Sequence, residues 1–220
     1  MTRPVVIAID GPVAAGKTVV GKKLSQKLGY KFVDTGTMYR AVAWMAVVRG
    51  VSPEDEEGLA CLAGEVSLEL SAENGERVLA NGEEVTAALR RPEVEERVSL
   101  VARLRGVRVA MVQKQRDLAA AGRIVMAGRD IGTVVLPDAA LKVFLVASQE
   151  ERARRRHAEL VAVGKAVTYE DVLGSLKLRD RIDSERAESP LRPAADAHLL
   201  DTDKLTVCQV LQSILELMED

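Results

Sequence analysis

The sequence predicts an α/β fold in which a parallel β-sheet is covered by helices on both faces. Five short apolar segments have the length and composition of buried strands, and longer stretches with apolar residues at helical spacing separate them. Because parallel strands need long crossover connections, usually helices, this alternation favours a parallel sheet. The candidate strands are residues 4–9, 31–34, 124–127, 142–147 and 198–201.

Helices are expected between and after these strands. Residues 17–28 show helical spacing, and residues 37–49 are long and apolar enough for a largely buried helix. Residues 150–165 and 168–184 are charged helical stretches, and residues 206–218 are expected to form a closing amphipathic helix.

One region, residues 65–86, interrupts this alternation. Its pattern is closer to that of antiparallel strands, with Asn74-Gly75 and Asn81-Gly82 at hairpin-turn positions. We therefore expect a single domain of 220 residues that carries a small β-rich insertion. The core is assigned to residues 1–64, 106–149 and 190–220, the insertion to about 65–105, and a lid with its following helix to about 150–189.

Charge and composition exclude several classes of protein. Lys and Arg total 31 against 33 acidic residues, and aromatic residues make up only 3%, so neither a basic field nor a stacking platform for nucleic acid is expected. The longest fully apolar run, residues 41–48, is too short to span a bilayer. We expect a cytoplasmic monomer with no nucleic-acid or membrane partner.

The two cysteines, Cys61 and Cys208, lie far apart and outside any metal-binding spacing. They are predicted to be small buried apolar residues in a reducing compartment. Neither a zinc site nor a disulfide framework is indicated.

The first chemical motif lies between the first strand and the first helix, where eight residues fit the Walker A pattern GxxxxGK[ST]. In such a P-loop, glycines let backbone N–H groups face the phosphates of ATP, Lys17 reaches the β and γ phosphates, and the Thr18 hydroxyl holds Mg²⁺. A glycine-rich turn with a surface lysine is the alternative, but the flanking strand and helix favour a P-loop. The ATP-binding residues are Gly11, Pro12, Val13, Ala14, Ala15, Gly16, Lys17 and Thr18.

A P-loop does not identify the group that receives the phosphate, so the acceptor site is sought at the carboxyl ends of the other strands. Residues 34–40 follow the second strand, and Arg40 is a candidate for binding an acceptor phosphate. Asp34 with Thr35 or Thr37 also fits a helix cap. The two roles are compatible.

A second motif, Gly128-Arg129-Asp130-Ile131-Gly132-Thr133, follows the third strand. Its glycines permit close backbone approach, while the Arg129 guanidinium and the Asp130 carboxylate offer donors and an acceptor. A surface turn with an ion pair between these two side chains is the alternative. Joint occurrence with a P-loop favours a ligand site.

The third motif comprises Arg179, Asp183 and Arg186, which share one face of a helix because their spacings are four and three. The alternative is an exposed ladder of salt bridges, and the accompanying P-loop again favours a ligand site.

The densest basic cluster consists of Arg152 and residues 154–156. Arg152 and Arg156 share a helix face, which suits a flap that closes on transferring phosphates. A solvated face paired with Glu150, Glu151 and Glu159 is the alternative, and the spacing does not show which arginine is essential.

In this order, the segments resemble the bacterial cytidylate kinases of the nucleoside monophosphate kinase superfamily over nearly the whole chain. The similar segments include IDGPVAAGKT, FVDTGTMYRAVA, AGRDIGTVVLPDAALKVFLVAS and KLRDRIDSERAESPLRPAADA. The resemblance implies a P-loop NTPase-type parallel sheet of five strands, an insertion on the acceptor side and a short helical lid on the donor side. It also implies ATP with Mg²⁺ as the donor and CMP or dCMP as the acceptor.

The resemblance further implies which residues bind the acceptor. Ser99, Arg108 and Asp130 correspond to the base-reading set, and Asp183 to the ribose contact. Val13 and Ala14 depart from the Ser and Gly usual in the family, so Val13 removes a hydroxyl near the phosphates. The full acceptor set is Thr35, Arg40, Ser99, Arg108, Arg129, Asp130, Arg179, Asp183 and Arg186, of which Arg40, Arg129, Arg179 and Arg186 are the phosphate candidates.

The expected reaction moves the γ-phosphoryl group of ATP to CMP or dCMP, with Lys17, Arg152 and Arg156 as the catalytic residues. Such a transfer needs alignment and charge neutralisation but no general base, because the acceptor oxygen belongs to an ionised phosphate. One rival is a related P-loop kinase that acts on UMP or a metabolite. A second rival is a nucleotide-dependent switch. The sequence contains no NKxD-type guanine-reading motif, and in a switch the strand-end arginines would have no function.

Overall fold

The computed structural model describes residues 5–70 and 77–218. Its main sheet has five strands in the order β2-β6-β1-β7-β8, and every neighbouring pair is parallel. This confirms the predicted parallel sheet and the positions of its strands. The strands are β1 (Val6–Asp10), β2 (Lys31–Asp34), β6 (Ile124–Ala127), β7 (Leu141–Val146) and β8 (His198–Asp201).

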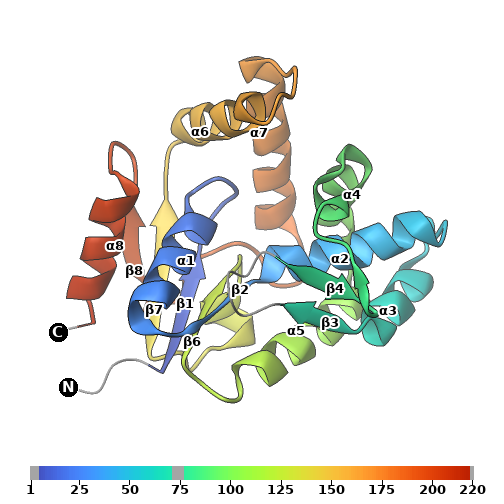
Figure 1. Ribbon diagram of the computed structural model, residues 1–220, viewed down its shortest axis with the longest axis horizontal. Coiled ribbons are helices and arrows are strands. Elements are labelled where there is room, and N and C mark those ends of the chain that lie inside the picture. The colour runs from blue at the N-terminus through green and yellow to red at the C-terminus, as the bar shows by residue number, and fades with distance from the viewer. Residues whose placement is uncertain (1–4, 71–76, 219–220) are drawn as a thin grey trace.

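Helices cover both faces of this sheet, as predicted (Figure 1). Apolar side chains of α1 and α8 pack on one face, and those of α2 and α5 pack on the other. None of the helices in the described part of the chain has both the length and the apolar composition needed to cross a membrane. The helices are α1 (Lys17–Leu28), α2 (Thr35–Val48), α3 (Glu56–Glu65), α4 (Pro92–Ala102), α5 (Arg105–Ala119), α6 (Gln149–Ala162), α7 (Tyr169–Glu185) and α8 (Val207–Glu216).

The alternation of side chains along β1 explains why both faces are apolar. Ile7 and Ile9 belong to the hydrophobic cluster under α1 and α8, whereas Ala8 between them belongs to the cluster under α2 and α5. Successive side chains of a strand point to opposite faces, so a central strand covered on both faces is apolar at consecutive positions, here Val6 to Ile9.

The insertion contains a small antiparallel sheet of β3 (Leu68–Leu70), β4 (Val78–Ala80) and β5 (Glu83–Glu84). Ala80 pairs with Glu83, so Asn81 and Gly82 form the two-residue turn between β4 and β5. Their φ angles of 51° and 81° fit the left-handed turn that Asn-Gly favours. This part of the prediction is confirmed, and the turn predicted at residues 74–75 lies outside the described residues.

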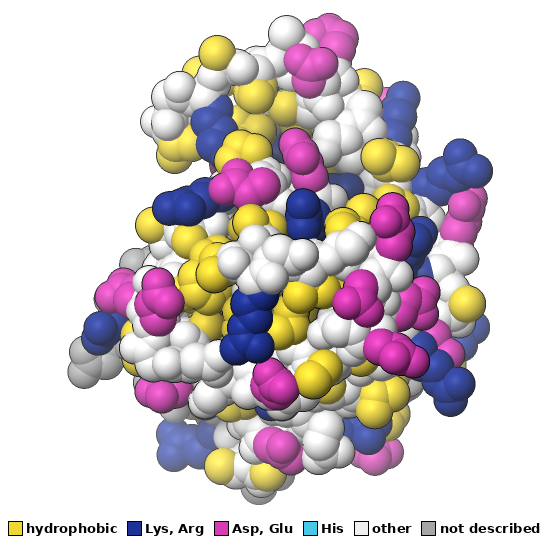
Figure 2. Space-filling view, turned by 90° about the vertical axis from the view of Figure 1, so that its right-hand side faces the viewer, with side chains coloured by type: hydrophobic (Ala, Val, Ile, Leu, Met, Phe, Trp, Pro, Cys, Tyr) yellow, Lys and Arg dark blue, Asp and Glu magenta, His cyan; other side chains and the backbone are white. Residues whose placement is uncertain are grey.

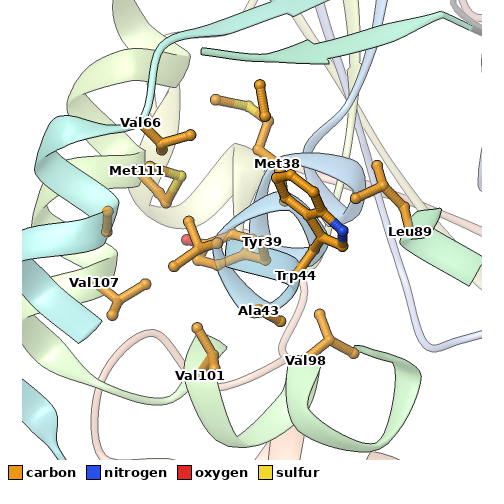
Figure 3. Packing of buried hydrophobic residues seen from close by; sticks show 14 of the residues in the cluster. Met38, Tyr39, Ala43, Trp44, Val66, Leu89, Val98, Val101, Val107 and Met111 are labelled. Atoms are coloured by element: carbon orange, nitrogen blue, oxygen red, sulfur yellow. The ribbon is translucent and has the colours of Figure 1, made fainter. Parts of the chain in front are cut away.

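One hydrophobic cluster joins the insertion to the sheet through α2 (Figure 3). Met38, Tyr39 and Trp44 of α2 share it with Val98 of α4 and Met111 of α5. Burying such side chains contributes about 1.5–3 kcal/mol each, so this shared cluster stabilises the packing of the insertion against the sheet.

The prediction that the cysteines are buried is wrong, because Cys61 and Cys208 are both exposed. On α3, Leu59, Leu62 and Ala63 are the buried positions, and helical geometry turns Cys61 away from that face. The Cys61 thiol lies 3.2 Å from a carboxylate oxygen of Glu65 one turn later.

Candidate active site

The P-loop connects β1 to α1 and leaves the amino end of α1 open for an anion. Gly11 has a φ angle of 144°, and a Cβ at this position would collide with the carbonyl oxygen of Leu145. Gly16, with a φ angle of 95°, is the N-cap residue and has no side chain to bond the first N–H groups of α1. Unbonded N–H groups at a helix amino end, together with the helix dipole, favour the binding of an anion.

Lys17 is buried at the first position of α1, and its ammonium group donates a 2.5 Å hydrogen bond to the Pro12 carbonyl oxygen. Burial lowers the pKa of Lys17 well below its ordinary value, and the neighbouring Arg129 lowers it further. A negatively charged ligand in the P-loop would stabilise the protonated form.

Thr18 and Asp34 place two oxygen ligands beside the P-loop. The Thr18 hydroxyl donates to Asp34 Oδ2 at 2.7 Å, and Asp34 Oδ1 caps α2 by accepting from the Gly36 N–H at 3.0 Å. Burial would raise the pKa of Asp34, but Arg40 and the Thr18 hydroxyl bring it below the ordinary value. Asp34 is therefore an ionised cap, and a hydroxyl beside a carboxylate is a donor set that suits Mg²⁺.

Asp10, at the end of β1, ties the P-loop to the loop that follows β6. Its two carboxylate oxygens accept hydrogen bonds from the backbone N–H groups of Ile131 and Gly132 at 2.8 and 2.7 Å. Burial raises the pKa of Asp10 to about 6, although these two bonds oppose the rise. The residue thus fixes the position of neighbouring Asp130 relative to Gly11.

The predicted base-reading residues Arg108 and Asp130 form a buried ion pair. Arg186 adds a second guanidinium, whose Nη2 lies 3.7 Å from Asp130 Oδ1. Ser189 bridges the two arginines, because its hydroxyl accepts from Arg108 Nε at 3.2 Å and its carbonyl accepts from Arg186 Nε at 2.6 Å. Asp130 pairs with these distant residues rather than with its neighbour Arg129, so the surface-turn alternative is wrong.

Arg129 instead pairs with Asp183 of α7, with Nε 2.9 Å from Oδ2. Burial would raise the pKa of Asp183, but Arg129 and Arg186 bring it below the ordinary value. Because Asp183 is buried, the exposed-ladder alternative for this motif is wrong. The positive charge of Arg129 also lowers the pKa of Lys17.

The phosphate candidates Arg40 and Arg179 meet at one carboxylate of the insertion, that of Glu95 on α4. Arg40 Nε lies 2.8 Å from Glu95 Oε1, and Arg179 Nη1 lies 3.3 Å from Glu95 Oε2. Burial would raise the pKa of Glu95, but Arg40 and Arg179 lower it to about 2.

The remaining acceptor candidates, Thr35 and Ser99, are both buried. The Thr35 hydroxyl donates to the Ala127 carbonyl oxygen at 3.0 Å, which joins α2 to the end of β6. Ser99 lies one turn before Ala102 on α4, and the Ala102 carbonyl accepts from Arg108 Nη1 at 3.2 Å. Thr35 thus lies at the carboxyl end of β6, and Ser99 lies on the helix whose Ala102 carbonyl binds Arg108.

The two arginines proposed for the lid differ in their surroundings. Arg152 is buried, binds both carboxylate oxygens of Asp180 at 3.0 and 2.6 Å, and donates to the Val13 carbonyl oxygen of the P-loop at 3.1 Å. Arg156 is partly exposed and pairs with Glu159 at 3.2 Å. The solvated-face alternative therefore does not hold for Arg152, which fastens α6 to the P-loop.

An open pocket of about 410 Å³ lies beside the start of α6. Glu151 and Arg154 of α6, Tyr169 of α7, and Asp203 and Lys204 after β8 are among its lining residues. Seen from the side that carries α2, α3 and α4, the space-filling view shows a separate notch between the part built by α6 and α7 and the body below it, with Lys and Arg side chains along its edges (Figure 2).

Four residues of the site were not predicted from the sequence: Asp10, Glu95, Asp180 and Ser189. Asp10 carried a usable signal, because it is an acidic residue at the carboxyl end of a buried strand, directly before the P-loop. The other three are recognised only from their partners in the folded chain.

A P-loop that adjoins a cluster of arginines paired with carboxylates, at the carboxyl ends of parallel strands, defines a nucleotide-dependent phosphotransferase. The family model for cytidylate kinase matches residues 7–220. A cytidylate kinase of Exiguobacterium sp. is 49% identical over 221 residues, which cover 100% of this chain and 99% of that protein. A cytidylate kinase of Pelotomaculum thermopropionicum is 50% identical over 211 residues, covering 95% and 93%. The chain belongs to the cytidylate kinase family.

Among solved structures, an uncharacterized protein from Eubacterium ventriosum matches with a TM-score of 0.53 at 13% identity, over 98% of both chains. This likeness concerns the fold alone.

Proposed function

We infer that the protein transfers the γ-phosphoryl group of ATP to CMP or dCMP, giving ADP and CDP or dCDP. The observation that carries this inference is the buried ion pair between Arg108 and Asp130, at the strand end next to the P-loop. Cytosine presents an amino donor at position 4 and an acceptor at N3. A fixed carboxylate beside a fixed guanidinium complements that edge and opposes the edge of uracil.

The charges of the site suit an in-line transfer between two phosphates. Lys17 and the amino end of α1 bind the donor phosphates, while Arg40, Arg129 and Arg179 bind the acceptor phosphate. These cations neutralise charge that develops in the transition state, and the acceptor oxygen needs no general base because its phosphate is already ionised.

Mg²⁺ is the expected cofactor with ATP, held by the Thr18 hydroxyl with the Asp34 carboxylate nearby. When bound, it would neutralise part of the charge of the donor phosphates. Arg152 and Arg156 complete the catalytic group from the lid, whose closure excludes water. The pocket beside α6 is of a size to take the nucleoside part of ATP.

We propose that the protein works as a monomer, and in the cytoplasm, where ATP and nucleoside monophosphates occur. We also propose that the chain forms a single domain, with the insertion on the acceptor side and the lid on the donor side. ATP and CMP or dCMP are its partners, and nucleic acid is not.

A coupled assay with ATP, Mg²⁺ and either CMP, dCMP, UMP or AMP tests this function. We expect kcat/KM for CMP and dCMP to exceed that for UMP and AMP by at least about 100-fold, because mismatched bases leave buried polar groups unpaired. Equal turnover of UMP or AMP would show that the acceptor assignment is wrong.

A further inference from the structure

Glu95 lies at the centre of a group of arginines that come from three different parts of the chain. Arg40 of α2 and Arg179 of α7 contact its two oxygens at 2.8 and 3.3 Å. Arg90, in the short 3₁₀ helix Ala88–Arg90 of the insertion, lies 3.7 Å away. The carboxylate is 16% exposed, so these contacts are only weakly screened by solvent.

The contacts leave most of the donors of Arg40 and Arg179 available for a ligand. Arg40 uses Nε toward Glu95, and Arg179 uses Nη1. A guanidinium has five N–H donors, so each side chain can be held by Glu95 and still bind an anion. Arg179 Nε is buried and has no hydrogen-bond partner in the described part of the chain.

The carboxylate also offsets repulsion among the arginines. Burial and then Arg129 lower the pKa of Arg179 to about 10, and Glu95 opposes this change. Without a negative charge between them, the guanidinium groups of Arg40 and Arg179 would repel each other and separate. Glu95 therefore keeps two cations side by side before any phosphate has bound.

We propose that Glu95 is a positioning residue for the acceptor phosphate: it holds Arg40 and Arg179 in the arrangement that binds the phosphate without touching the phosphate itself. Because Glu95 belongs to α4, the insertion contributes to phosphate binding through this residue. The proposal rests on the proposed function.

A competing role for Glu95, in which its carboxylate blocks the phosphate site, predicts the opposite effect of a neutral substitution at this position. If Glu95 occupied the place of the phosphate and competed with it, neutralising Glu95 would tighten acceptor binding. Simple electrostatics also favours tighter binding, because removing a negative charge makes the site more attractive to an anion. Weaker acceptor binding in a neutral variant is therefore specific to a positioning role.

Steady-state kinetics of Glu95→Gln with CMP and ATP test the proposal. We expect KM for CMP to rise by about tenfold, because misplaced guanidiniums bind the phosphate poorly, while kcat stays within about threefold and KM for ATP within about twofold. Glu95→Asp keeps the charge and should recover part of the loss. Glu96→Gln, at an exposed position of the same helix, should behave as the unchanged protein.

An unchanged or lower KM for CMP in Glu95→Gln would overturn the proposal, as would equal loss with CMP and ATP. If a thermal melt shows that Glu95→Gln is not folded, Glu95→Asp is tested in its place. An unchanged KM for CMP in Glu95→Asp would then contradict the proposal. Turnover of CMP by the unchanged protein tests the proposed function separately.

Discussion

Arg108 of α5 and Asp130 after β6 form an ion pair in which both side chains are almost completely buried. Burying two charges costs desolvation energy, so such a pair adds little to the stability of the fold unless hydrogen bonds satisfy both groups. Ser189 and the Ala102 carbonyl supply further acceptors for Arg108. Such a preorganised pair can select a base, because rearranging it to fit a mismatched base would cost free energy.

We expect Asp130→Asn to lose activity with CMP and to narrow the CMP to UMP ratio of kcat/KM by at least about tenfold, or about 1.4 kcal/mol. The amide presents a donor that suits the uracil oxygen and removes the charge that opposed it. Exposed Asp138→Asn is the matched control. Unchanged CMP activity with an unchanged ratio would show that Asp130 does not read the base.

The same substitution leaves Arg108 buried without its carboxylate partner, which destabilises the fold by about 3–5 kcal/mol. A thermal melt therefore has to accompany the kinetics, and the assay temperature must lie below the lowered melting point.

Lys17→Ala should lower kcat by at least about 10³-fold, because the lysine acts on charge that develops between the β and γ phosphates. The fold should remain intact, since burial already disfavours the Lys17 charge. Lys23→Ala, exposed on the same helix, should leave kcat unchanged. Near-normal turnover of Lys17→Ala in a coupled assay would contradict the P-loop mechanism.

Ala14 has a φ angle of 60°, a left-handed conformation in which a side chain is strained. Replacing it with Gly should raise the free energy of unfolding by about 1 kcal/mol, measured by urea denaturation. Ala15→Gly is the control, because Ala15 has no positive φ and its replacement should destabilise by about 0.5–1 kcal/mol. Equal effects of the two substitutions would argue against strain at Ala14.

Asp10 should make stability fall as pH rises from about 4 to about 6, since burial raises its pKa from 3.8 to about 6. In this range the folded state binds more protons than the unfolded state, so each rise in pH favours unfolding. The free energy of unfolding of the unchanged protein minus that of Asp10→Asn should fall by up to about 3 kcal/mol and then level off. A difference that rises over this range would contradict the account.

The parts of the fold that local patterns encode could be predicted from the sequence. The buried strands are short apolar runs, the P-loop has fixed spacing, and Asn81-Gly82 has the residues that its turn requires. Predicted strand ends also located Asp130 and Arg40, because ligands gather where parallel strands end.

The rest depends on residues that only the folded chain brings together. Glu95 and Arg179 are 84 positions apart, and Arg108 and Ser189 are 81 apart, so no local spacing reveals their contacts. Cys61 shows the same limit on a smaller scale. Its apolar character suggested burial, but the orientation of α3 decides which of its faces meets the core.

Direct transfer of the γ-phosphoryl group from ATP to CMP is the reaction on which the other predictions depend. Single-turnover mixing of excess enzyme with γ-labelled ATP, Mg²⁺ and CMP measures this most directly. We expect the label to appear in CDP, with little inorganic phosphate and almost no reaction when CMP is omitted. Label released as inorganic phosphate at the same rate with and without CMP would instead indicate a nucleotide hydrolase and contradict the account.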